Sequence, residues 1–191
     1  MRKLLFGLPL ALIFLAAGCS KDNTSDSAKV KFYYQATIGG ADYKVEIPYD
    51  NMNANLISGA NIAGMDEVVF TSYVTDLGDN GTGMIVEKGL MADYHDATTS
   101  DFKDFFGVGP HQLAIAGLHG VWIDWRDENG DIWTTKNGND QTGSTFNIVN
   151  VEEYDGPSEL KVTIQFNCKL YDGLGNFKSA SGTYVGVFKM H

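Results

Sequence analysis

Apolar and polar residues alternate along most of the chain from residue 29 onward. This period of two is typical of β-strands that bury one face and leave the other in water. A last pair of strands is expected to end near Met190. The other strands with a clear pattern are predicted at 30–38, 43–47, 68–75, 84–87 and 159–171. Turns rich in Gly, Asn and Asp separate them, so about nine or ten short strands are expected.

One short segment breaks the alternation. Residues 98–100 (Thr-Thr-Ser) are good N-cap residues, Asp101 puts a negative charge in a first helical turn, and Gly107 is a stop signal. We therefore expect a single short helix near 100–106. Many short strands with one helix predict an all-β fold, an antiparallel β-sandwich of two packed sheets.

The turn at Asn129-Gly130 is the best-defined local feature. Asn-Gly favours a two-residue type I′ turn, which would place Arg126 opposite Trp133. One outward face would then carry a platform for stacking sugars, with side chains that also bind hydroxyl groups. Its residues are Trp122, Asp124, Arg126 and Trp133. We favour a simpler interpretation, in which Arg126 and Trp133 form a cation–π pair and neighbouring chain covers Trp122.

Acidic turns suggest calcium, but the spacing of their oxygen ligands fits no EF-hand. Asp, Asn and Gly are also selected in turns for their backbone conformations alone. The weak candidates are Asp76, Asp79, Asp127 and Asp131. Four histidines lack zinc-site spacing: His95, His111, His119 and His191. No catalytic motif is present, so we expect no metal, no cofactor and no enzyme. A glycosidase carboxylate pair remains open, because the fold sets its spacing.

The N-terminus has the three parts of a secretory signal. Arg2 and Lys3 are followed by the apolar segment 4–15, and then by small residues at 16–18. Cys19 comes next, and the whole segment resembles a bacterial lipobox. The resemblance implies cleavage before Cys19 and acylation of that residue, with the membrane as partner through the lipid.

The polar segment that follows predicts a flexible tether over 19–29 and a single domain over 30–191. Residues 20–22 (Ser-Lys-Asp) resemble the export tag of surface lipoproteins in Bacteroidetes-type bacteria. Residues 26–28 (Asp-Ser-Ala) resemble the O-glycosylation sequence of the same bacteria, which makes Ser27 a candidate. The expected location is the outer membrane, at the cell surface, with its periplasmic face as the alternative.

Charge and cysteine content exclude several classes of protein. Loss of residues 1–18, with two positive charges, takes the formal net charge from −10 to −12. Such acidity argues against nucleic-acid binding and against electrostatic docking on anionic lipid. With Cys19 acylated, Cys168 is alone, so no disulfide framework exists. Cys168 falls in the apolar positions of a predicted strand, where it is expected to be a small buried residue.

The C-terminal half resembles a group of small Bacteroidetes-type lipoproteins with β-sandwich domains. The resemblance rests on strand and turn patterns at 120–130, 133–135, 141–148, 166–172 and 182–188. It implies fold and location, but that group has no agreed activity from which residues could be carried over. The sequence favours a non-enzymatic surface module that captures glycan or peptide. The alternatives are a structural subunit of an outer-membrane complex and, third, a hydrolase of extracellular polymers.

Overall fold

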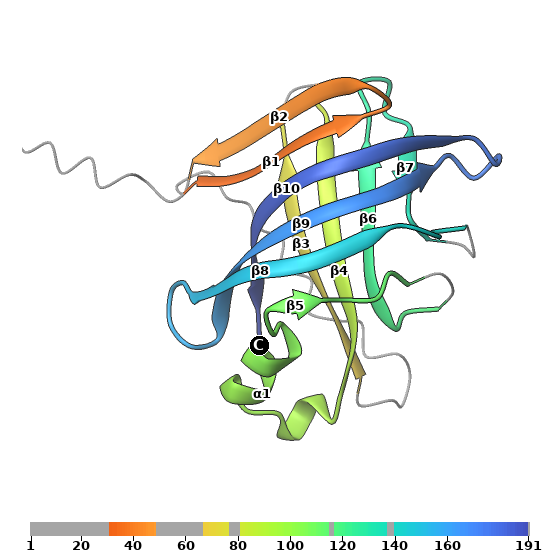
Figure 1. Cartoon of the computed structure of the whole chain (residues 1–191). Helices are drawn as coiled ribbons and strands as arrows, with labels where there is room; N and C mark the ends of the chain where they lie inside the picture. The colour runs from red at the N-terminus through yellow and green to blue at the C-terminus, as the bar shows by residue number, and fades with distance from the viewer. Residues whose placement is uncertain (1–30, 49–66, 77–80, 115–116, 137–139, 191) are drawn as a thin grey trace, which may run out of the picture.

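The alternating segments form ten β-strands, which a computed structural model arranges in one antiparallel sheet (Figure 1). The structure describes residues 31–48, 67–76, 81–114, 117–136 and 140–190. The strands are β1 (Lys31–Ile38), β2 (Ala41–Pro48), β3 (Glu67–Thr75), β4 (Gly83–Ala92), β5 (Gly109–Pro110), β6 (Gly120–Arg126), β7 (Ile132–Thr134), β8 (Thr145–Glu153), β9 (Glu159–Tyr171) and β10 (Phe177–Lys189). A short 3₁₀ turn, η2 (Tyr94–Asp96), and one helix, α1 (Thr99–Phe105), join β4 to β5.

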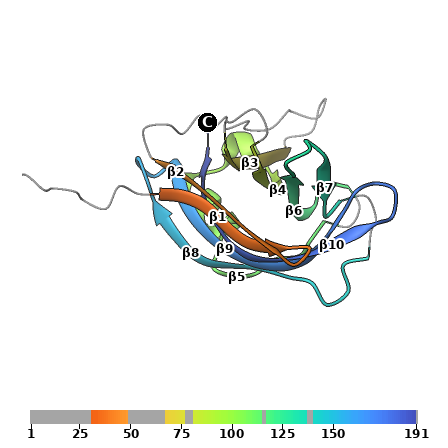
Figure 2. The ribbon, with the colours of Figure 1, turned by 90° about the horizontal axis from the view of Figure 1, so that it is seen from above.

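The sheet is a curled half-barrel. Its order is β2-β1-β10-β9-β7-β6-β4-β3, with β8 paired to β9 and β5 paired to β8. Figure 2 shows the strands curving around a concave side, and in Figure 1 the layer of β1, β10, β9 and β8 runs across β3, β4 and β6. The antiparallel β class is confirmed, but two separate sheets are not observed. The physical reason is β9, which pairs with β8 along most of its length and bridges to β7 at Tyr171 opposite Thr134.

The predicted elements are largely confirmed. The segment 159–171 is β9, and its apolar side chains are all buried. The expected final pair of strands is instead one long strand, β10, which forms a hairpin with β9. Helix α1 begins after Thr98, whose hydroxyl accepts a hydrogen bond from the Asp101 backbone, while the Asp101 carboxylate accepts one from Thr98. In the part of the chain that is described, no helix has the length and apolarity needed to cross a membrane.

Helix α1 closes one end of the half-barrel with aromatic rings. Phe70 on β3 contacts Phe102, Phe105 and Phe106, and the rings of Phe106 and Phe188 lie 4.5 Å apart. Edge-on and tilted contacts of this kind add to the free energy gained from burying the rings. The helix is therefore held by packing, which a segment of this length requires.

The two crossing layers meet at a buried hydrogen bond. The Tyr184 hydroxyl of β10 donates to Ser72 Oγ of β3 over 2.8 Å. Both side chains are fully buried, and burial raises the pKa of Tyr184. Gly186 makes room for this contact, because a Cβ there would lie 2.3 Å from Ser72 Oγ and 2.5 Å from the Tyr184 ring. The absence of a side chain at Gly186 sets how closely β10 approaches β3.

Lys88 departs from the apolar character of the inner face. It lies opposite Phe70 and Val121 in the ladder, is only 7% exposed, and holds its ammonium 4.0 Å from the centre of the Phe105 ring. Within the described residues no carboxylate pairs with it. Burial therefore disfavours the charged form and lowers the pKa of Lys88 to about 8.

Replacing Gly186 with Ala is expected to lower the free energy of unfolding by about 2–4 kcal/mol, since the new methyl group must displace Ser72 or Tyr184. Urea denaturation of the variant measures this change. The control is Ser179→Ala, at an exposed position of the same strand, which should shift stability by less than about 0.5 kcal/mol. A Gly186→Ala protein as stable as the control would contradict the close crossing.

Replacing Lys88 with Met is expected to stabilise the protein at pH 7 by about 2–3 kcal/mol. The unfolded chain keeps the Lys88 proton up to its ordinary pKa of 10.5, whereas the folded chain releases it near 8. Stability of the parent therefore rises between these two values, and the advantage of the variant shrinks over the same range.

Urea titrations of both proteins at pH 7 and pH 10 test this expectation for Lys88. The control is Lys103→Met on α1, because that side chain is about half exposed and pairs with Glu153. A Lys88→Met protein that is less stable than the parent at both pH values would show that the buried Lys88 ammonium does not destabilise the folded protein.

Candidate functional site

Five residues, 127–131, connect β6 to β7, so the hairpin does not have the expected two-residue turn. Trp125 lies opposite Trp133, and Arg126 lies opposite Ile132. The cause is Asp127, whose carboxylate accepts hydrogen bonds from the backbone of Asn129 and Asp131. Gly130 supplies the positive φ of 85° that such a loop requires. The predicted register is therefore wrong by one residue.

The shift separates the residues of the predicted sugar platform. Trp133 shares the inner face with Trp125, while Trp122, Asp124 and Arg126 lie on the outer face. Trp122 is only 1% exposed. The guanidinium of Arg126 donates to the backbone oxygen of Gly81, so the expected Arg126–Trp133 pair is replaced as well. The four residues do not form one exposed surface.

On the outer face, Trp122 and Asp124 belong to a polar cluster held by Lys136. The Lys136 ammonium lies 2.8 Å from a Glu87 oxygen, 3.5 Å from an Asp124 oxygen and 4.3 Å from the centre of the Trp122 ring. The indole of Trp122 also donates to Glu87, and Thr134 donates to Asp124 over 2.5 Å. Glycoside hydrolysis needs open space for substrate and water between two carboxylates, and here an ammonium lies between them.

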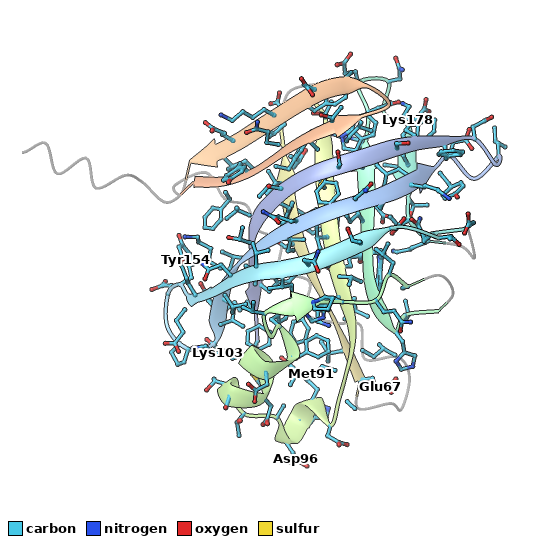
Figure 3. All side chains as sticks on the ribbon, viewed as in Figure 1. Glu67, Met91, Asp96, Lys103, Tyr154 and Lys178 are labelled. Atoms are coloured by element: carbon cyan, nitrogen blue, oxygen red, sulfur yellow. The ribbon has the colours of Figure 1, made fainter. Side chains whose placement is uncertain are left out.

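Trp133 belongs to a second cluster, which caps the other end of the half-barrel from α1. The Lys178 ammonium, placed in Figure 3 at the start of β10, lies 3.8 Å from the Trp133 ring centre and 5.1 Å from that of Trp125. Asp127 accepts from the Trp133 indole at 3.0 Å and pairs with Lys178 at 3.4 Å. Burial works to raise the pKa of Asp127, but these hydrogen bonds and those from the loop backbone lower it overall.

The described calcium candidates do not form a metal site. Asp127 is occupied by the contacts above, and Asp131 is an exposed loop residue. Asp79 and His191 lie outside the described residues. Among the described residues no group of three or more His, Cys, Asp or Glu side chains is placed to hold a metal ion. His111 contacts the backbone oxygen of Gly107 over 2.8 Å, and burial lowers its pKa.

A groove on the outer face of β1, β2 and β10 is the feature that the sequence did not reveal. Its volume is about 480 Å³, within the range of small-molecule sites. Three neighbouring strands line the groove. Alternate residues of each strand face outward, and those that are cross-strand partners lie side by side in rows. The rows are Lys44–Gln35–Thr183 and Asp42–Thr37–Ser181, and Tyr33 lies beside the first of them on β1.

The groove residues are polar but differ from the clusters around the tryptophans, because most of them are exposed. Gln35 has an exposed amide, and Tyr33 is half-buried with its ring packed against the core. Thr37 donates to Asp42 over 2.6 Å, and Lys44 pairs with Glu46 over 2.7 Å. The groove therefore combines a held aromatic ring with hydroxyl and amide groups.

Cys19 and Ser27 lie outside the described residues, whereas Cys168 is buried as expected, and burial raises the pKa of its thiol to about 12. A buried thiol of this kind is a packing residue.

Comparison of the chain with protein-family models, with curated proteins and with solved structures finds no match in any of the three.

Replacing Lys178 with Met is expected to lower the free energy of unfolding by about 1–2 kcal/mol, because the variant loses the cation–π contacts and leaves Asp127 without its ammonium. Thermal or urea unfolding measures the loss. Lys178→Arg keeps a cation above the rings and should recover at least about half of it. Equal stability of the Met variant and the parent would mean that the cluster does not hold this end closed.

Proposed function

We propose that the protein is a lipid-anchored binding module of the bacterial outer membrane, displayed at the cell surface and not an enzyme. The lipobox at Cys19 and the polar segment that follows support the anchor and the tether. The resemblance to small surface lipoproteins supports the location. The ligand class in this proposal is a glycan or a peptide captured outside the cell.

The observation that carries the binding role is the groove on β1, β2 and β10. It is a hollow within the size range of small-molecule sites, lined mainly by polar side chains on the outer face of three strands. Its strand β1 starts at Lys31, directly after the expected tether. By contrast, the two tryptophans of the predicted platform are committed to internal contacts with Lys136 and Lys178.

A second function, a structural subunit of an outer-membrane complex, is favoured by one exposed apolar site. The β9–β10 hairpin carries Leu174, 88% exposed, and Phe177, 54% exposed. The start of β10 lies at the Ile38 end of β1, away from the end that follows the tether. Apolar side chains presented in this way are typical of protein contact sites.

Replacing Cys19 with Ser is expected to release the protein from the membrane fraction, because acyl chains supply about 0.8 kcal/mol of membrane affinity per buried CH₂. Detergent partitioning and mass spectrometry of the mature N-terminus measure the change. The matched control is Cys168→Ser, which should remain anchored. A Cys19→Ser protein that still fractionates with membranes would refute the lipid anchor.

Display at the cell surface can be tested independently of the lipid anchor. Protease added to intact cells should remove the domain of the parent protein, while a periplasmic marker stays whole. Protection of the domain until the outer membrane is broken would place it on the periplasmic face and would contradict surface display.

A further inference from the structure

The groove is centred on β1, which along Tyr33–Ile38 pairs with β2 on one side and with β10 on the other. On its β2 side the groove reaches an edge of the described sheet, because β2 is the last strand in the order. A peptide that added a strand would bind along that edge, whereas the groove itself presents side chains of three paired strands. The chemistry of these side chains therefore decides which ligand the groove fits.

The side chains of the groove suit a ligand that has many hydroxyl groups and little charge. Gln35, Thr183 and Ser181 offer both donors and acceptors, as a hydroxylated ligand requires. The two charged side chains already have partners, Asp42 with Thr37 and Lys44 with Glu46. A strongly charged ligand would have to compete with these contacts.

Tyr33 adds the apolar surface that sugar rings need. It is half-buried, packs against residues of the core cluster and also lines the groove. An aromatic ring held in place loses little conformational entropy when a flat apolar face of a sugar stacks on it. Beside it, Lys44, Gln35 and Thr183 form one row across the three strands.

We infer that the groove binds a neutral oligosaccharide, with Tyr33 as its stacking residue and with Gln35 and Thr183 as hydrogen-bonding residues. This inference rests on the proposed function and narrows its ligand class from glycan or peptide to glycan.

The experiment uses the full lipidated protein in detergent micelles, applied to an array of neutral and acidic oligosaccharides and to a peptide library. Binding to neutral oligosaccharides is expected. Tyr33→Ala should weaken it at least about tenfold, because the stacking surface is lost, whereas Tyr33→Phe should keep it within about threefold. Phe177→Ala, an exposed aromatic outside the groove, is the matched control and should bind like the parent.

Thermal unfolding of each variant shows whether it is folded. If Tyr33→Ala proves unstable, Gln35→Ala at an exposed position supplies the same test, with an expected loss of about threefold or more. Peptide binding that is lost in these variants, with no glycan binding, would overturn the inference and leave the proposed function intact. Absence of binding to both libraries, or glycan binding that neither variant weakens, would overturn the inference and the role of the groove together.

Discussion

The hydrogen bond from Tyr184 to Ser72 marks the constraint on which the fold depends, the close crossing of β10 over β3. Among the described strands, the edges of the sheet, β2 and β3, do not pair with each other, and no ladder there closes the barrel. Packing must hold the curl instead. A buried hydrogen bond stabilises an apolar interior only when its donor and its acceptor are both held in position. Gly186 leaves the space that the Tyr184 and Ser72 side chains need. The crossing therefore specifies one curvature among the many that apolar burial alone would allow.

The concave side is filled mainly by apolar side chains, with the Tyr184–Ser72 hydrogen bond and Lys88 as buried exceptions. The polar clusters around the tryptophans lie at one end of the half-barrel and on its outer face. At one end a lysine and two tryptophans form a closed cluster, and on the outside Lys136 pairs with two carboxylates beside a buried indole. Both arrangements pair their charged groups with one another. The groove on β1, β2 and β10 is different, since its hydroxyl and amide groups are turned to solvent.

Strand positions were predictable from the sequence because each strand has one apolar and one wet face, as in β9. Pairing was harder to predict. The register of the β6–β7 hairpin depends on hydrogen bonds from the Asp127 side chain, which Asn-Gly propensity does not include. The bridge between Thr134 and Tyr171 that makes one sheet out of two is a contact between distant segments. Lys88 is buried on the inner face, although a charged residue is normally predicted to face solvent. The groove residues have the same polar pattern as any solvent-exposed strand face, so their sequence does not distinguish them.

The negative net charge of the chain bears both on the proposed lipid anchor and on the proposed class of ligand. A chain with a formal charge of −10 repels polyanions and anionic membrane surfaces, so neither electrostatic steering nor lipid attraction would concentrate an acidic ligand at the groove. A neutral ligand meets no such field, and it would be recognised by stacking and hydrogen bonds whose strength depends little on salt. Acyl chains on Cys19 would then provide what the charge cannot, a fixed position at the membrane while the acidic domain stays in solution. The proposed anchor, the charge and the groove thus favour the same kind of ligand, and we propose that it is an uncharged molecule met outside the cell.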